Sequence, residues 1–199
     1  EINFAKALQM SLYFYDANKC VSGITGGNLE WRGDCHTEDA AVPLKPMGED
    51  YKGTNLSQEF IDAHRDILDP DGDGTIDVAG GMHDAGDHVK FCLPGSYAAS
   101  TLGWGYYEFR DAYVDSGQQW HIEDILHWFN DYYLKCTYFD ENGDILAFCY
   151  QVGEGDIDHN YWNAPELQNE SLLDFARPAY FATVETPASD MCAGVAASL

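Results

Sequence analysis

Two carboxylates lie three residues apart in the segment Asp84-Ala85-Gly86-Asp87-His88-Val89-Lys90-Phe91, the part of the chain best suited to chemistry. Carboxylates grouped in this way can bind a metal ion, or they can hold and deprotonate a water molecule. The aromatic ring of Phe91 favours a cleft that faces a substrate. The competing interpretation is a capped acidic turn with no chemical role.

A second acidic segment runs from Asp69 to Asp77. It places side-chain oxygens at positions 1, 3, 5 and 9, with glycine at 6, as an EF-hand calcium loop does. Position 12, where a glutamate should close the shell, is Gly80. Because four carboxylates this close repel one another without a cation, we predict a structural calcium ion, with a solvated acidic turn as the alternative. Its expected ligands are Asp69, Asp71, Asp73, Asp77 and the carbonyl of Thr75.

Aromatic and polar side chains meet in Asp158-His159-Asn160-Tyr161-Trp162. Sugars present apolar C–H faces and hydroxyl groups, so rings that stack beside hydrogen-bonding groups form a natural glucan-binding surface. We therefore predict that substrate is bound by His159, Tyr161, Trp162 and His88. The alternative is that both rings belong to the core and His159 holds a loop. Upstream, Arg32 and Asp34 are expected to be structural partners near the cleft.

Charge and composition limit the class of protein. The 199 residues are 45% hydrophobic and 14% aromatic, which predicts one globular domain. A formal net charge of -24 argues against a nucleic acid or an anionic membrane as partner and suits a neutral polysaccharide. No apolar run approaches the ~20 residues that span a bilayer. Nothing in the sequence calls for an organic cofactor.

The six cysteines include no C-x-x-C pair, which argues against a zinc knuckle or a thioredoxin-type site. Free buried thiols are one interpretation. The other is a disulfide between Cys20 and Cys35, which bracket a glycine-rich loop, and this would suit a secreted, extracellular protein.

Helices dominate the hydrophobic pattern. The apolar spacing predicts amphipathic helices behind an Asn3 cap and a Ser57 cap. A long loop is expected over 20–56, and a β-hairpin turns at Asn142-Gly143 between 137–139 and 145–150. The helices expected elsewhere are 95–114, 121–135, 171–175 and 189–199. With no alternation of strands and helices, the prediction is an all-α domain whose chemistry lies on loops.

The acidic segment also resembles a known family. The run from Gly80 to Phe91 is similar to the base-bearing segment of glycoside hydrolase family 9 cellulases. The other motifs follow in the family's order, as Trp31-Arg32-Gly33-Asp34, Tyr150-Gln151-Val152-Gly153-Glu154-Gly155, Pro165-Glu166 and Arg177-Pro178-Ala179-Tyr180. The resemblance implies an (α/α)6 barrel of twelve helices. Residues 1–199 have room for about six, so we expect the N-terminal portion of one catalytic domain, whose partner is the remainder of that domain.

The resemblance also assigns roles. It implies an endo-β-1,4-glucanase of cellulose or related β-glucans that works by inversion. Asp87 would be the general base that deprotonates the attacking water, and Asp84 would help to hold that water. An inverting enzyme needs a second carboxyl group as acid. No residue here matches the family's acid motif, so the acid glutamate is expected outside this chain.

Two other functions remain open at this point. His83, Asp84, Asp87 and His88 have a spacing that could ligate a divalent ion in a metal-dependent hydrolase. Alternatively, the missing acid would suit a non-catalytic, calcium-dependent carbohydrate-binding module. The first predicts a metal that touches both aspartates, and the second predicts glucan binding without release of reducing ends.

Overall fold

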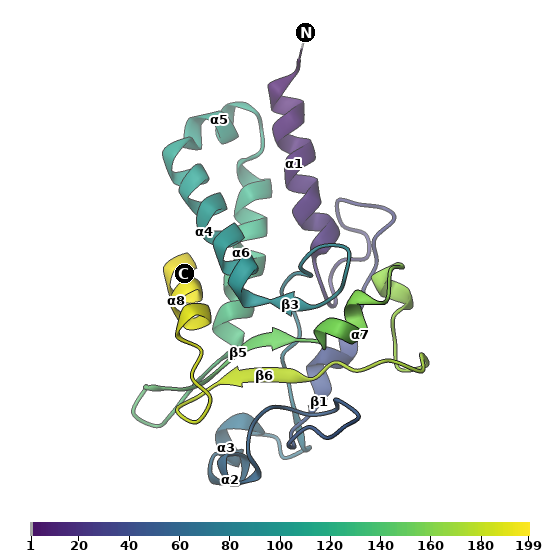
Figure 1. Ribbon diagram of the computed structural model, residues 1–199. Helices are drawn as coiled ribbons and strands as arrows, with labels where there is room; N and C mark the ends of the chain where they lie inside the picture. Colours follow the sequence, from purple (N-terminus) through teal and green to yellow (C-terminus); the bar gives the residue numbers. More distant parts are fainter. Residues whose placement is uncertain (1) are drawn as a thin grey trace.

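The computed structural model describes residues 2–199 as a layer of helices on a small sheet (Figure 1). Three long helices lie alongside one another, and α4 also packs against the C-terminal helix α8. Their bounds are α1 (Phe4–Asn18), α4 (Cys92–Glu108), α6 (Gln119–Lys135) and α8 (Ser189–Ser198). No helix within residues 2–199 has both the length and the apolar character needed to cross a membrane.

The predicted caps and the main apolar stripe are confirmed. The side chain of Asn3 accepts a hydrogen bond from Lys6 N, and that of Ser57 accepts one from Phe60 N. These bonds satisfy amide groups that the first turn of a helix leaves without partners. On α6 one face is buried, and its members are Ile122, Ile125, Phe129, Tyr132 and Tyr133.

Two predicted helices are each broken into two. The 57–68 segment forms α2 (Gln58–Ala63) and α3 (Arg65–Leu68), because His64 leaves the helical region with φ −128°. The 95–114 segment forms α4 and α5 (Arg110–Asp115), with Phe109 at φ −122° between them. The start of α4 also lies earlier than predicted, at Cys92. Pro94 therefore occupies the first turn, where a missing N–H costs no hydrogen bond.

The predicted hairpin is confirmed, and two further strands join it. The sheet contains β3 (Lys90–Phe91), β4 (Thr137–Phe139), β5 (Ile145–Val152) and β6 (Ala179–Ala182). β5 pairs antiparallel with the other three. Neither β3 nor β6 was predicted, because two to four residues carry too little alternation to be recognised. β1 (Val42–Pro43) and β2 (Thr75–Ile76) form a separate pair.

The helix predicted from Ser171 to Phe175 is wrong. The segment is a series of turns, and Leu173 is fully exposed, so no apolar face exists to stabilise a helix. The side chain of Asn169 accepts hydrogen bonds from both the backbone N–H and the hydroxyl of Ser171. Such local side-chain bonds compete with helix formation. The loop at 20–56 is present, interrupted by η1 (Thr37–Ala41) and β1. Short helices that were not predicted are α7 (Gly155–His159) and η2 (Pro165–Leu167).

Candidate functional site

The acidic loop from Asp84 to Val89 is fixed at both ends. Asp84 N donates to the carbonyl of Val89, and β3 then pairs with β5 through Lys90 opposite Val152. The Asp87 side chain is 11% exposed, whereas Asp84 is exposed. Partial burial raises the pKa of Asp84, and the nearby charge of Asp87 raises it further. The two carboxylates thus lie close enough for the charge of Asp87 to act on Asp84.

The aromatic segment folds onto this loop. His159, at the end of α7, lies with Nδ1 3.3 Å from Asp87 Oδ2, and its ring makes an edge contact with Trp162. A Cβ on Gly86 would stand 2.7 Å from the Trp162 ring, so only glycine allows this close approach. Trp162 is 68% exposed, which argues against a core role for its ring. Tyr161 contacts the His88 ring at 5.8 Å between centroids.

A buried glutamine orients His88. Gln168 Nε2 donates to Asp158 Oδ1 over 2.6 Å, which turns its Oε1 toward the two histidines His88 and His36. Oε1 lies 2.6 Å from His88 Nδ1 and 3.0 Å from His36 Nε2. As an acceptor-only oxygen, Oε1 requires the proton on each of these two nitrogens. Burial lowers the pKa of His88 to about 4, so the ring is neutral at pH 7 and Nε2 carries its lone pair.

A buried ionic network holds the acidic loop against neighbouring segments of the chain. Asp39, which has no exposed surface, accepts from Arg177 Nε at 2.7 Å and lies 2.8 Å from Lys90 Nζ. Arg177 Nη1 reaches Asp158 and donates to the carbonyl of His88. The network therefore joins the acidic loop to η1, which carries Asp39, and to the segment before β6, which carries Arg177. The sequence analysis identified none of these contacts.

Arg32 and Asp34 both have structural roles, as predicted, but each has other partners and they do not pair with one another. Arg32 is 4% exposed, and its Nε lies 2.7 Å from Glu166 Oε1. Asp34 Oδ1 accepts from the backbone N–H groups of Ile24 and Thr25. Both side chains therefore hold the loop at 20–35 in place.

Four buried side chains that the sequence analysis did not group form a second candidate metal centre. Ligand atoms of Cys20, Cys35, His36 and His83 all lie within 4.8 Å of one another. Both thiols are free and buried, so of the two interpretations open from the sequence the structure has free thiols and no Cys20–Cys35 disulfide. Two thiols with two imidazoles match the donors that Zn²⁺ prefers. His36 Nε2 is engaged by Gln168, and His36 Nδ1 faces the other side chains of the cluster, 3.2 Å from His83 Nε2 and 3.9 Å from Cys20 Sγ. Spacing along the chain gave no signal, because the four residues meet only through tertiary folding.

The metal-dependent hydrolase hypothesis is not supported by the geometry. His83 lies with the two thiols, and His88 Nδ1 is engaged by Gln168. Among residues 2–199, the potential metal-binding groups do not combine these histidines with Asp84 and Asp87. The two aspartates and the two histidines therefore do not form one metal site.

The predicted calcium ligands gather in part. The carboxylates of Asp69, Asp71 and Asp73 lie within 4.8 Å of one another, and Asp69 Oδ1 is buried with no hydrogen-bond partner among the described residues. An orphaned buried oxygen beside two carboxylates fits a hard cation such as Ca²⁺. Asp77 does not join this group, because its Oδ1 lies 2.6 Å from Lys135 Nζ. Asp73 also accepts from the Thr75 hydroxyl.

We expect calcium to raise the melting temperature and EDTA to lower it, because the ion would neutralise the carboxylates of Asp69, Asp71 and Asp73. The shift should disappear in Asp71→Asn/Asp73→Asn. Differential scanning calorimetry measures it, with Asp174→Asn, an exposed aspartate in the turn segment, as the control. An unchanged melting temperature in calcium and in EDTA would leave only the solvated turn.

The chain is similar in sequence to known proteins along nearly its whole length. The family model for glycosyl hydrolase family 9 matches residues 4–199. Endoglucanase 4 of Bacillus sp. (strain KSM-522) is 31% identical over the whole chain, and Endoglucanase 14 of Oryza sativa subsp. japonica is 30% identical over 99% of it. The chain spans only 25% and 36% of the lengths of these two relatives.

Two solved structures are also similar to this chain. The catalytic domain of Clostridium thermocellum CelT is 52% identical, with a TM-score of 0.90 over 99% of this chain and 38% of that one. The endoglucanase of the termite Nasutitermes takasagoensis is 27% identical, with a TM-score of 0.72 over 99% and 36%. These matches confirm the predicted fold, since this chain has the architecture of part of an (α/α)6 barrel. The chain belongs to glycosyl hydrolase family 9.

Proposed function

We propose that the protein hydrolyses β-1,4-glucosidic bonds in cellulose or related β-glucans. The observation that carries this proposal is the pair Asp84 and Asp87 beside exposed Trp162 and His159, in a chain of this family. The relatives named endoglucanase support the activity. The structure of the endoglucanase CelQ complexed with cellobiose and cellotriose supports a β-glucan as the substrate.

In this proposal Asp87 acts as the general base. Its carboxylate takes a proton from a water molecule that attacks the anomeric carbon, while Asp84 accepts the second hydrogen bond of that water and orients it. His159 Nδ1, 3.3 Å from Asp87 Oδ2, holds the base in position. Trp162 offers a ring on which the apolar face of a sugar stacks, with Gly86 leaving room for it. Tyr161 packs against the ring of His88, which is buried and supports the loop rather than facing the substrate.

We place the acid outside residues 1–199, because no residue here matches the family's acid motif and three of the glutamates are engaged in other contacts. Glu154 accepts from the Tyr180 hydroxyl, and Glu166 pairs with Arg32. Glu185 accepts from Ser57. An inverting mechanism needs about 6.5 to 9.5 Å between base and acid, so that a water fits between base and sugar.

We also propose that the protein is secreted, since its polymeric substrate lies outside cells. Assay of the culture medium against the cell lysate would test this.

The activity is tested on the protein in its natural full length with carboxymethylcellulose. We expect release of reducing ends. Glucan binding without any release would favour the carbohydrate-binding module. The Asp84→Asn and Asp87→Asn variants locate the site, because retention of full activity in both would remove these residues from the mechanism.

Gln168 is proposed as a positioning residue, because it fixes the proton on His88 Nδ1 and the orientation of that ring. Gln168→Leu should lower kcat about tenfold or more, since it leaves the buried His88 and Asp158 without their partner at a cost of about 1–3 kcal/mol. Gln168→Asn, which keeps both the acceptor for His88 and the donor to Asp158, should recover part of the loss. Steady-state kinetics on cellotetraose measure both, with the exposed Gln58→Leu as the control. An equal loss in Gln168→Asn and Gln168→Leu would contradict the positioning role.

A further inference from the structure

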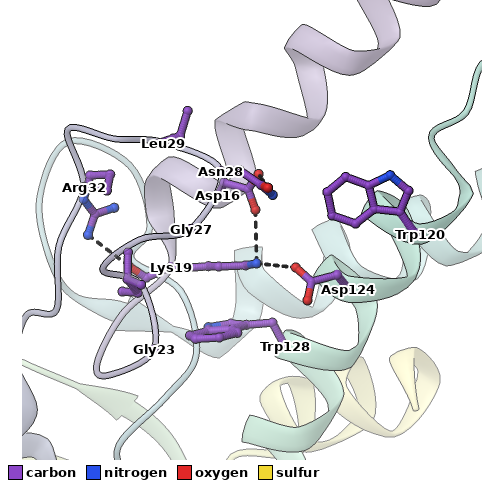
Figure 2. Close-up of a pocket in the computed structure, with 11 residues that line it drawn as sticks. Asp16, Lys19, Gly23, Gly27, Asn28, Leu29, Arg32, Trp120, Asp124 and Trp128 are labelled. Atoms are coloured by element: carbon purple, nitrogen blue, oxygen red, sulfur yellow. Dashed lines mark hydrogen bonds and ion pairs between the residues drawn. The ribbon is translucent and has the colours of Figure 1, made fainter.

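A cavity of about 200 Å³ lies between the C-terminal end of α1, the loop at 23–29 and α6 (Figure 2). None of the residues assigned above to catalysis, substrate binding or the two candidate metal sites lines it. The cavity combines buried charges with two tryptophans, which is unusual for a simple packing defect, because such defects are apolar. These are features of a binding site.

The floor of the cavity is rigid. Lys19 is 8% exposed, and its Nζ lies between Asp16 and Asp124, as Figure 2 shows. The same ammonium sits 4.9 Å from the centre of the Trp128 ring. Trp128 is in turn fixed by its Nε1, which donates to the carbonyl of Gly81 over 2.7 Å. These contacts form the site before any ligand arrives, which lowers the entropy cost of binding.

Hydrogen-bond capacity is left over in the cavity, mostly as acceptors. Asp16 is 5% exposed, and its Oδ1 makes an ion pair with Lys19 at 3.1 Å but no aligned hydrogen bond among residues 2–199. Asn28 uses its Nδ2 on Asp16 Oδ2, which leaves its own oxygen free within the described contacts. Asp124 is about half exposed and uses one oxygen on Lys19. Asp16 Oδ1 is thus a buried acceptor, and the exposed oxygens of Asn28 and Asp124 lie beside it. A ligand that donates hydrogen bonds would satisfy all three.

Trp120 supplies an apolar wall. Its ring is 57% exposed and stacks on His121 with 14° between the planes. His121 is held by Asp16 through a 2.6 Å contact between Nε2 and Oδ2. The exposed ring is thus anchored to the cavity floor through His121, and it offers a flat surface to a ligand.

The charges select the class of ligand. A cation would be repelled by Lys19 in the centre, and an anion by Asp16 and Asp124. A neutral ligand with several hydroxyl groups and one apolar face satisfies both the acceptors and the tryptophan wall. The volume is below that of pockets for drug-sized ligands and suits about one sugar ring.

We propose that this cavity is an auxiliary carbohydrate site that holds one glucosyl unit of a β-glucan chain, separate from the Asp84 and Asp87 loop. The choice of glucan rests on the proposed function, while the polyol chemistry rests on the cavity alone. A site of this kind would keep the protein on its polymer between catalytic events. It would not alter turnover of a short soluble substrate.

The test uses the natural full-length protein and its Trp120→Ala variant on insoluble cellulose and on cellotetraose. We expect binding to cellulose about two- to tenfold weaker in the variant, with unchanged kcat on cellotetraose. Trp31→Ala, which removes a ring 69% exposed outside the cavity, is the matched control and should bind like the parent protein. Asp124→Lys should weaken binding in the same direction without touching the ring.

A second readout separates the two proposals. Titration of cellotriose should shift the indole N–H signals of Trp120 and Trp128 in a spectrum of the labelled protein, whether or not the protein hydrolyses glucans. If cellulose is hydrolysed but Trp120→Ala binds normally and the two signals do not move, the auxiliary site is wrong and the proposed function stands. If the signals move but no glucan is hydrolysed, the proposed function is wrong and the site stands.

Discussion

Asp87→Asn should lower turnover of a β-1,4-glucan by roughly 10²–10⁴-fold, because the amide cannot take the proton of the attacking water. Binding of cellotetraose should be nearly unchanged, since Asp87 is largely covered and the ring proposed to stack on the sugar is that of exposed Trp162. Steady-state kinetics and calorimetric titration on the natural full-length protein measure the two quantities. Asp174→Asn, on an exposed turn, should leave both at the parent value.

If Asp87→Asn instead lowers the affinity for cellotetraose as much as it lowers turnover, Asp87 supports the loop rather than acting as the base. Melting curves decide between the two, because a supporting role requires a fall in melting temperature as well. Asp84→Asn should retain more activity than Asp87→Asn, since the base remains and only the second acceptor for the water is lost.

Asp39→Asn should destabilise the folded protein by about 3–5 kcal/mol, the largest stability effect expected in the chain. The substitution leaves Lys90 and Arg177 as buried cations without their shared counter-ion. Urea unfolding, followed by circular dichroism, measures the change. The control is Asp62→Asn, whose pair with Arg65 is exposed and should contribute about 0–1 kcal/mol. Equal effects of the two substitutions would contradict the structural role of the network.

The same network predicts a dependence on acid. Burial alone would raise the pKa of Asp39, but the charges of Arg177 and Lys90 outweigh it and hold that pKa well below its usual range. In the unfolded chain the pKa of an aspartate is about 3.9. The stabilisation by Asp39 is therefore complete above that pH and is lost as the pH falls toward the folded pKa. The parent should lose stability below pH ~4 more steeply than Asp39→Asn does.

Local features were predicted well because they depend on neighbouring residues. The Asn3 and Ser57 caps, the apolar stripe of α6 and the turn at Asn142-Gly143 each reflect contacts within a few positions. The segment at 171–175 shows the limit of this reasoning. Its apolar residues suggested a helix, but the bonds from Asn169 to Ser171 and the exposure of Leu173 produce turns.

The candidate site was predicted only where it lies on one stretch of chain. Asp84 and Asp87 were recognised from their spacing, and His159 and Trp162 were recognised separately as residues suited to a glucan-binding surface. The remaining contacts join distant segments, such as Asp39 with Arg177 and Gln168 with His36. The Cys20 and His83 cluster has the same origin. Such contacts are selected by tertiary packing, which no local spacing encodes.

The stereochemistry of hydrolysis tests the central claim most directly. The natural full-length protein is mixed with cellotetraose in an NMR tube, and the anomeric proton of the new reducing end is followed before mutarotation. Attack of a water activated by Asp87 on a β-linkage predicts that the α-anomer forms first. First appearance of the β-anomer would mean that a covalent intermediate is formed, and would contradict the role of Asp87 as the base of an inverting hydrolase.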